Sequence, residues 1–410
     1  MTDKLTVAEL HFNVVNDNGN SEQAMRINGE LFTQPNIYSI DKPDVKENKD
    51  PQDFIPTLMD ELYVTITSTA ITSNGDYYIG KRAYNSDTRH PMRIHIPKFE
   101  QDLPIINTLG ALAGKAVISA FSKSKKAPKT INLTVDMVTA LPIDQYRKAA
   151  NVERFAKKFM DNTHQVQVHL GNTFVTVNIE FDYVYVLQES SSAMYNIILN
   201  TEKQWRNDEL FAELIEDYEL DSFTGEDVYN MPMVCCGDIG EGTFDVAMME
   251  QYKQNPDLSK GAKMGVGYSI NKALPDFIDT YGFSDIPKHQ YMEYVKDAKS
   301  DWHDEAVSIL KNNTKDQSEQ MINLLEEIVW HKAMRKPKLL VMFGGGSIIS
   351  KDEMYEPLRN LMDGCKGKLL WIPEKYATTM NVDGMQVFMN TLFPQLKAKY
   401  KPSKEKETAK

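Results

Sequence analysis

One stretch near the middle of the chain constrains the possible folds more than any other. Residues 234–247 read VCCGDIGEGTFDVA, in which two apolar runs flank an aspartate, two glycines and a threonine. Apolar alternation on either side of a short glycine-containing connection is typical of a β-hairpin. Glycine also lets a backbone approach a ligand and present its N–H groups in a concave array. The stretch therefore predicts a hairpin with a tight turn, which serves either the turn alone or a phosphate group.

The side chains of this hairpin have the chemistry of a phosphate and metal site. Asp238 stands at the end of the first predicted strand, where a carboxylate can hold a hydrated divalent cation. Gly240 and Gly242 can offer backbone N–H groups, and the Thr243 hydroxyl can contact a phosphate oxygen. Short motifs occur often by chance, so a plain hairpin explains this stretch equally well when it is taken alone.

A second strand–turn–strand occurs near the start of the chain. Residues 10–27 hold two β-rich runs around NDNGNS at positions 16–21. Asn-Gly is a strong hairpin signal by itself, so a plain turn is the simpler interpretation. The likeness to the first hairpin lies in the order of strand, aspartate, glycine, small polar residue and strand. Two such turns could hold one polyphosphate from both sides, here with Asp17, Asn18, Gly19, Asn20 and Ser21.

Two further segments follow predicted strands. Glu189 comes directly after the long alternating strand 174–187 and before serines that precede an apolar helix. Open α/β sheets place their chemistry past such strand ends, although a carboxylate is also favoured at any helix N-terminus. The buried strand 338–343 runs into Gly344, Gly345, Gly346 and Ser347, a pattern that indicates close backbone approach to a ligand at a helix start. Neither GxGxxG nor GxxxxGK[ST] occurs in the chain.

Composition sets the broad class. The chain has 410 residues, of which 41% are hydrophobic, so two or more domains are expected. A net charge of -12 argues against direct binding of nucleic acid. The 3 cysteines include an adjacent pair inside an apolar strand, which predicts small buried residues in a reducing compartment. We find no signal peptide and no apolar run near membrane-spanning length, and we expect a cytoplasmic protein without membrane contact.

Periodicity predicts the remaining elements. We expect a hairpin over 62–84, an amphipathic helix over 104–121, a strand over 131–140 and helices over 144–161, 201–230 and 269–281, the last kinked at Pro275. A long helical region follows over 291–335, and then a last strand at 369–373 and a final helix. Residues 41–54 read as a solvated loop and 397–410 as a mobile tail.

Five motifs in order resemble one superfamily. Residues 17–21, Glu189 with Ala193, residues 238–243, residues 344–347 and NVDG at 381–384 are similar to the first phosphate loop, first connecting helix, second phosphate loop, adenosine loop and second connecting helix of the actin superfamily. That superfamily includes heat-shock chaperones and sugar kinases. Within it, LQES at 187–190, LLVMFGGG at 339–346 and MNVDGM at 380–385 are similar to the bacterial plasmid-segregation actins, the ParM/Alp group.

The resemblance implies an α/β, actin-like (ribonuclease H-like) two-domain fold with a nucleotide cleft between the domains. Domain I would cover 1–190 with the C-terminal helix 385–410 returning to it, and domain II would cover 191–384. ATP or GTP would bind with Mg²⁺, which Asp17 and Asp238 would hold mainly through water. Glu189 and Asp238 would be catalytic, and Ala193 and Gly384 would let two helices cross at a hinge. Glu241 departs from the family pattern, since many relatives have a glycine or another small residue at this position. An extra negative charge near phosphates would weaken their binding unless the side chain points away.

The function implied is a nucleotide-dependent polymerising ATPase. Its filaments would segregate plasmid DNA through a DNA-bound adaptor protein, without direct contact between this acidic chain and nucleic acid. Three alternatives stay open: a monomeric small-molecule kinase on the same fold, a chaperone-type ATPase, and a non-enzymatic scaffold that binds no nucleotide. Polymerisation separates the first two from the filament hypothesis, and nucleotide binding separates the third.

Overall fold

The computed structural model describes residues 7–41, 50–250 and 253–400. Within them the chain divides into two compact units. Unit 1 comprises Met1–Leu141, Gln145–Gln188 and Met385–Lys410, and unit 2 comprises Pro142–Asp144 and Glu189–Gly384. The first and last segments of the sequence therefore belong to the same unit.

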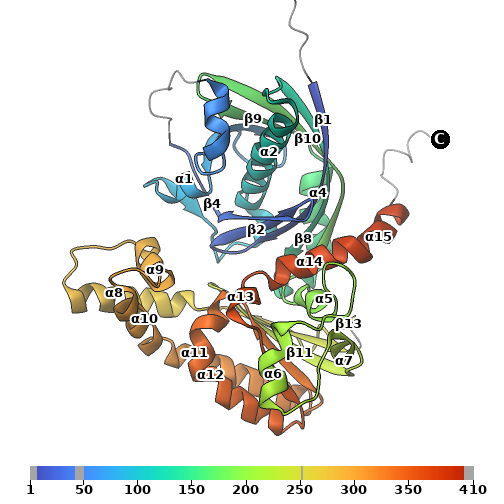
Figure 1. Cartoon of the computed structure of the whole chain (residues 1–410), viewed down its shortest axis with the longest axis vertical. Helices are drawn as coiled ribbons and strands as arrows, with labels where there is room; N and C mark the ends of the chain where they lie inside the picture. Colours follow the sequence, from blue (N-terminus) through green and yellow to red (C-terminus); the bar gives the residue numbers. More distant parts are fainter. Residues whose placement is uncertain (1–6, 42–49, 251–252, 401–410) are drawn as a thin grey trace, which may run out of the picture. The chain divides into compact units, whose positions relative to one another are not determined.

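Unit 1 is built on a ten-stranded sheet (Figure 1). Its spatial order is β3 (Glu30–Pro35), β2 (Glu22–Ile27), β1 (Val7–Asn18), β8 (Thr130–Leu141), β10 (Thr173–Gln188), β9 (His164–Leu170), β5 (Tyr63–Ser68), β6 (Gly75–Ile79), β4 (Ile37–Ser39) and β7 (Arg89–Pro91). Strand β1 pairs antiparallel with β2 and parallel with β8, and β8 is parallel to β10. The predicted hairpins at 10–27 and 62–84 and the strands at 131–140 and 174–187 are confirmed, except that α1 (Lys81–Tyr84) follows β6.

Helix α2 (Leu103–Ser124) is the central helix of unit 1 and contacts seven of the strands just named. The prediction of an amphipathic helix located it correctly but misjudged its surroundings, because 15 of its 22 residues are buried. Its length and composition would allow it to cross a membrane, contrary to our expectation from the sequence, but 83% of its most apolar window is buried inside the protein. It is therefore a core helix of unit 1.

Other helices complete unit 1. The charged helix predicted over 144–161 is two helices, α3 (Ile143–Tyr146) and α4 (Ala149–Met160), of which α4 packs on β10. Short 3₁₀ helices occupy Pro51–Thr57 and Lys98–Glu100, so the predicted loop over 41–54 is wrong at its end, while its middle lies outside the described residues. Helix α14 (Met380–Thr391) leads to α15 (Phe393–Lys399), and most of the predicted tail lies outside the described residues.

A buried histidine gives unit 1 a pH dependence. His164 is 3% exposed and contacts the Ser68 hydroxyl at 2.8 Å and the Phe159 carbonyl oxygen at 2.9 Å. Burial lowers the pKa of His164 below its ordinary 6.5. The unfolded chain therefore binds this proton more readily than the folded chain, so the stability that the neutral ring contributes is lost as the pH falls below 6.5.

We expect His164→Gln to reduce the acid sensitivity of unit 1. Between about pH 7.5 and pH 5.5 the variant should lose about 2–4 °C less in Tm than the parent, because the proton uptake that accompanies exposure of His164 on unfolding is absent. Thermal unfolding followed by circular dichroism at both pH values measures this. His95→Gln, at an exposed position of the same unit, is the control and should behave as the parent. Equal acid sensitivity in all three proteins would contradict the prediction.

Unit 2 contains a six-stranded sheet. Its order is β13 (Lys253–Gln254), β12 (Phe244–Glu250), β11 (Met233–Ile239), β15 (Leu339–Phe343) and β16 (Lys368–Trp371), with β14 (Lys260–Ala262) also paired to β12. Strand β11 pairs antiparallel with β12 and parallel with β15, which is parallel to β16. This repeats the arrangement of β2, β1, β8 and β10 in unit 1. The two units thus share one central strand pattern, in which a hairpin is followed by two parallel strands.

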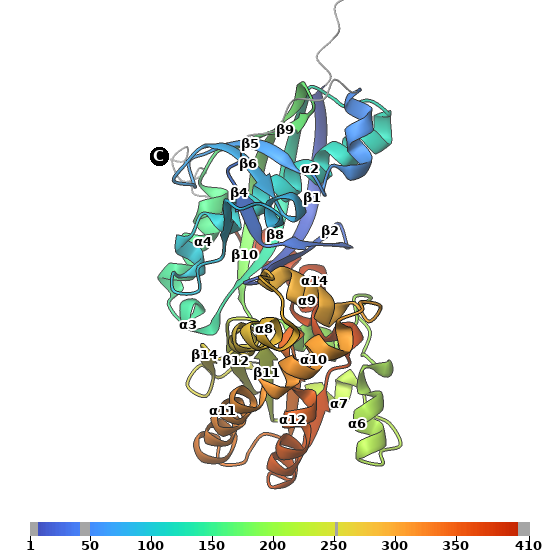
Figure 2. The same cartoon turned by 90° about the vertical axis from the view of Figure 1, so that its left-hand side faces the viewer.

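Helices cover both faces of this second sheet, and the layers can be followed in Figure 2. The hydrophobic cluster on one face includes residues of α8 (Gly267–Tyr281), α9 (Lys288–Lys296), α10 (His303–Asn312), α11 (Lys315–Glu326), the π-helical turn Glu327–Lys332 and α12 (Gly345–Asp363). The cluster on the other face includes residues of α5 (Ala193–Ile198), α6 (Ala212–Asp217), α7 (Gly225–Tyr229), α13 (Glu374–Ala377) and the start of α14. Cys235 faces the first layer and Cys236 the second, and both are fully buried, which confirms them as small core residues.

One prediction for unit 2 needs correction. The acidic segment predicted as helix over 201–230 forms only a 3₁₀ turn at Glu209–Phe211 and the short helices α6 and α7, because its few apolar residues anchor turns rather than one continuous face. Helix α8 continues through Pro275, so the proline lies inside the helix and does not interrupt it.

Candidate functional site

The first predicted loop connects β1 to β2 in unit 1. Asp17 pairs with Ala24 and Asn18 with Gln23 across the hairpin, which leaves Gly19, Asn20 and Ser21 as the connection. The carbonyl oxygens of Gly19 and Ser21 both accept hydrogen bonds from one residue, Asn36. Its side-chain Nδ2 donates to Gly19 at 2.6 Å and its backbone N–H donates to Ser21 at 2.8 Å. The three residues of the loop are at least partly exposed to solvent.

Asn18 is the member of this loop with an unmet polar requirement. Its side chain is 0% exposed, and neither its Oδ1 nor its Nδ2 has a hydrogen-bond partner among the described residues. A buried amide left without partners costs free energy. A polar group brought within hydrogen-bonding distance of this side chain would remove that cost.

The second predicted loop, Gly240 to Thr243, connects β11 to β12 in unit 2. The Gly240 N–H donates to the Thr243 carbonyl oxygen at 2.9 Å and closes the turn. The segment that starts α8 lies directly against it, because the N–H of Gly267 donates to the Glu241 carbonyl oxygen at 2.7 Å. The Thr243 hydroxyl donates to an oxygen of Asp245 at 2.8 Å, so in this state it is held within the hairpin.

Asp238, at the end of β11, is oriented by a chain of hydrogen bonds inside unit 2. Asn381 on α14 donates from its Nδ2 to Asp238 Oδ2 at 2.8 Å. Ser192, directly before α5, donates its hydroxyl to Asn381 Oδ1 at 2.9 Å. The sequence placed Asn381 in a connecting helix but assigned it no contact. The structure makes Asn381 the residue that joins both connecting helices to the aspartate.

The glycine-rich segment after β15 touches the same aspartate. Gly344 has a φ of +91°, and a Cβ there would overlap Asp238 Oδ1 and come within 2.6 Å of the Ile239 carbonyl oxygen. Only glycine meets both requirements. Ser347 is fully buried and donates its hydroxyl to the Gly344 carbonyl oxygen at 2.8 Å. Gly345 is exposed and Gly346 buried, so the backbone of the segment, rather than the Ser347 side chain, is the surface open to a ligand.

Glu189 begins unit 2, directly after β10, and its side chain is half-buried. The next residue, Ser190, has a φ of +66°, a conformation that a residue with a Cβ seldom adopts. This backbone conformation changes the direction of the chain between β10 and α5. At the other connecting helix, a Cβ on Gly384 would overlap the Ser192 carbonyl oxygen, so α14 and the start of α5 approach as closely as backbones allow.

The departure at Glu241 has a structural explanation. Lys288, the first residue of α9, places its Nζ 2.6 Å from Glu241 Oε1. The two side chains are 36% and 28% exposed, respectively. The extra negative charge of this loop is therefore paired with a cation. Sequence reasoning missed Lys288, since nothing in its local pattern links it to a loop 47 residues away.

The described residues contain no group of three His, Cys, Asp or Glu that could enclose a metal ion. Asp17 and Asp238 each stand near the end of a strand that begins a hairpin and pairs on its other side with a parallel strand. Mg²⁺ keeps several waters and binds through one or two carboxylates together with substrate phosphates. These two residues fit that mode of binding and do not fit an all-protein metal cage.

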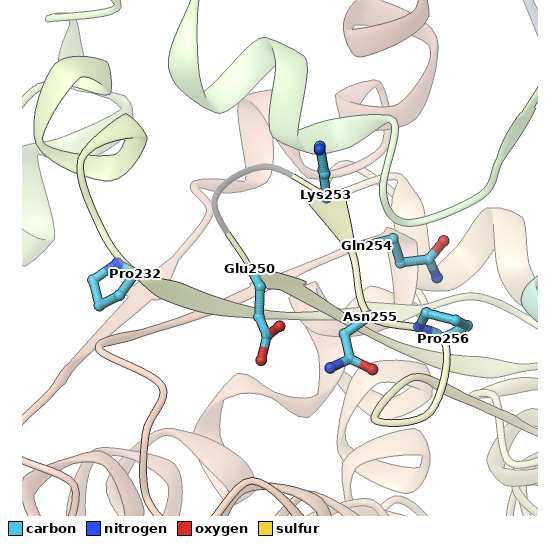
Figure 3. Close-up of a pocket in the computed structure, with 6 residues that line it drawn as sticks. All are labelled: Pro232, Glu250, Lys253, Gln254, Asn255 and Pro256. Atoms are coloured by element: carbon cyan, nitrogen blue, oxygen red, sulfur yellow. The ribbon is translucent and has the colours of Figure 1, made fainter.

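A solvent-open hollow of about 630 Å³ lies elsewhere in unit 2 (Figure 3). Its lining residues are Pro232, Glu250, Lys253, Gln254, Asn255 and Pro256. It is at the end of β12 opposite to the loop that contains Gly240. No predicted site residue lines it, so it is separate from the candidate site.

The repeated strand pattern and the two glycine-containing hairpins define the class: the chain has the actin-like, ribonuclease H-like α/β fold. A solved structure of the actin-like protein Alp7A matches 97% of this chain and 100% of its own at a TM-score of 0.66 and 18% identity. ParM of Bacillus thuringiensis, solved with ATP, matches 94% of this chain and 99% of its own at 0.60 and 15% identity. A non-polymerisable quadruple mutant of pCBH ParM matches 95% and 100% at 0.60 and 14% identity.

The similarity is structural. No protein-family model matches the sequence, and no curated protein matches it. The resemblance to plasmid-segregation actins that the motifs predicted is thus confirmed at the level of the fold.

Proposed function

We propose that this protein is a nucleotide-dependent, polymerising actin-like ATPase that segregates plasmid DNA. The observation that carries the proposal is the pair of equivalent hairpins. Each begins with a strand that pairs on its other side with a parallel strand, each has an aspartate near the end of that strand, and each turns through a short loop containing glycine. Two equivalent hairpins of this kind in one chain suit a ligand with several phosphates better than two unrelated turns do.

In this proposal the two units are domain I and domain II, and each contributes one phosphate-binding loop. The N–H groups of Gly19, Asn20 and Ser21 in the first loop and those of Gly240, Gly242 and Thr243 in the second bind the phosphates. Asp17 and Asp238 hold Mg²⁺ mainly through its waters. Backbone of Gly344, Gly345, Gly346 and Ser347 approaches the nucleoside, whether adenosine or guanosine. The fold likeness to a ParM solved with ATP supports this assignment.

Hydrolysis would depend chiefly on positioning and electrostatics. Mg²⁺, when bound, neutralises charge on the phosphates. Glu189 orients the attacking water, and the hydrogen-bonded chain of Ser192, Asn381 and Asp238 keeps the aspartate in place. Correct orientation of reactants alone lowers a barrier substantially. Phosphate release would then change the relation of the two domains about the hinge at Ala193 and Gly384.

Coupling this change to contacts between subunits gives a filament whose lifetime depends on the bound nucleotide. The filament would move plasmid DNA in the cytoplasm through a DNA-bound adaptor protein. The net charge of -12 supports an indirect link to DNA, since direct phosphate contacts require a surplus of basic side chains. Fold likeness to Alp7A and to a ParM with a non-polymerisable mutant supports self-assembly.

Light scattering and phosphate release, recorded together on the purified chain, test the proposal. We expect a rapid rise in scattering after addition of ATP or GTP with Mg²⁺, accompanied by phosphate release, and no lasting rise with ADP. Hydrolysis without scattering would favour the kinase or chaperone alternative. Absence of a response to every nucleotide would contradict the proposal and favour a non-enzymatic scaffold.

A further inference from the structure

The loop between β1 and β2 is held from inside unit 1 by a single residue. Asn36 lies in the short connection between β3 and β4 and is 1% exposed. Its side chain and its backbone N–H donate to two of the three carbonyl groups of the loop, those of Gly19 and Ser21. A loop of three residues held at two carbonyls has little freedom to change its peptide orientations.

The orientation of the Asn36 amide is itself determined. Asn107, fully buried on α2, donates from its Nδ2 to Asn36 Oδ1 at 2.8 Å. Because Asn36 Oδ1 accepts this bond, its Nδ2 faces Gly19 as a donor. A chain of contacts therefore runs from the core helix α2 through Asn107 and Asn36 to the loop.

This arrangement also fixes the direction of a neighbouring N–H. In a planar trans peptide, the carbonyl of one residue and the N–H of the next point in opposite directions. Holding the Gly19 carbonyl toward Asn36 turns the Asn20 N–H away from the core. Successive N–H groups directed to one side form an anion-binding concavity.

We propose that Asn36 is a positioning residue that presets the first loop for phosphate, with Asn107 as its anchor. The inference rests on the proposed nucleotide function for its ligand. The two hydrogen bonds from Asn36 to the loop, which we call the clamp, are a property of unit 1 alone. Asn36 does not need to touch the nucleotide. Its contribution is that the loop has its binding geometry before the ligand arrives, which lowers the ordering cost of binding.

The same region supplies a matched control. Gln34, two residues before Asn36 and 5% exposed, donates from its Nε2 to Gln23 Oε1 at 2.8 Å. Gln23 in turn donates to Asn16 Oδ1 at 3.0 Å. Gln34 is thus a buried amide of the same polar layer, but it donates to another side chain and not to the loop backbone.

The test compares Asn36→Asp with Gln34→Glu in the full chain. Each keeps the size of the side chain and replaces a buried donor by a carboxyl group. When ionised, the new carboxylate of Asn36→Asp sets an oxygen against the Gly19 carbonyl, whereas the protonated acid can donate to it. Burial raises the pKa of a carboxyl group, so lowering the pH should restore the clamp in this variant.

Titration with a fluorescent ATP analogue and Mg²⁺ measures the effect. We expect Asn36→Asp to raise Kd about tenfold or more at about pH 8 and to recover most of the loss at about pH 6. Gln34→Glu should stay within about twofold of the parent at both pH values while its Tm falls. If nucleotide binding is weakened equally in the two variants, the effect comes from the stability of the core, and the inference is overturned. A folded Asn36→Asp with the parental Kd would also overturn it.

Hydrogen exchange separates failure of the clamp from failure of the proposed function. If the parent binds no nucleotide, the proposed function fails, and exchange on the ligand-free chain still tests the clamp. Faster exchange at residues 19–21 in Asn36→Asp than in Gln34→Glu supports it, and equal rates overturn it. If Asn36→Asp does not fold, Asn107→Ser removes the hydrogen bond that orients Asn36. This variant should change Kd and hydrogen exchange at residues 19–21 in the same direction but by a smaller amount.

Discussion

Replacing Asp238 by alanine is expected to lower nucleotide hydrolysis by about a hundredfold or more, the size of effect seen when one preorganised electrostatic group is lost. Asp238 is held by Asn381 Nδ2 at 2.8 Å and lies against the Gly344 backbone, so its direction is fixed before any ligand binds. In the proposed site it is one of two carboxylates that hold Mg²⁺. Phosphate release at saturating nucleotide and varied Mg²⁺ measures the loss.

Asp238→Asn separates charge from hydrogen bonding at this position. An asparagine can keep the bond to Asn381 through its side-chain oxygen, so it preserves the local structure and removes only the negative charge. We expect it to hydrolyse nearly as poorly as the alanine variant and to need more Mg²⁺. Asp279→Ala, at an exposed position of α8, should match the parent. If Asp238→Asn hydrolyses at the parental rate, the assignment of Asp238 is wrong.

Glu189→Ala is expected to reduce hydrolysis strongly while it leaves assembly largely intact. A residue that orients the attacking water contributes about a hundredfold or more to hydrolysis. Glu189 precedes a turn in which Ser190 has a φ of +66°, so its position after β10 is set by an unusual backbone. Filaments of the variant should form with ATP at a near-parental rate and then persist, because the step that shortens their lifetime is slowed.

Scattering and phosphate release, recorded in the same cuvette, test this separation. The control is Glu202→Ala, at an exposed position of unit 2, which should assemble and disassemble as the parent does. A Glu189→Ala variant that hydrolyses normally would contradict the assignment of Glu189. A variant that neither hydrolyses nor assembles would show instead that Glu189 is needed for nucleotide binding or for the fold of the α5 region.

Local sequence patterns predicted those elements whose alternation of apolar and polar residues is complete within the element itself. The alternation around NDNGNS and around DIGEGT predicted both hairpins, and the apolar run before Gly344 predicted β15. Strand β9 was missed, because its alternation of His, Gln and Val is weakly apolar and is completed only by pairing with β10 and β5. The helical prediction over 201–230 failed because charged residues at helical spacing do not by themselves bury a face.

The amino-acid sequence alone pointed to the candidate site residues. Aspartates, glycines and a glutamate at strand ends are local in sequence, and local periodicity is enough to find them. Only the tertiary structure decided which residues hold them in place. Asn36 binds Gly19, and Asn107, 71 residues away in the sequence, binds Asn36. Lys288 pairs with Glu241 across 47 residues of sequence, and Asn381 binds Asp238 across 143 residues. These partners are single polar side chains in otherwise ordinary helices and connections. Their roles arise from distance in space, which packing of the core sets and no local pattern records.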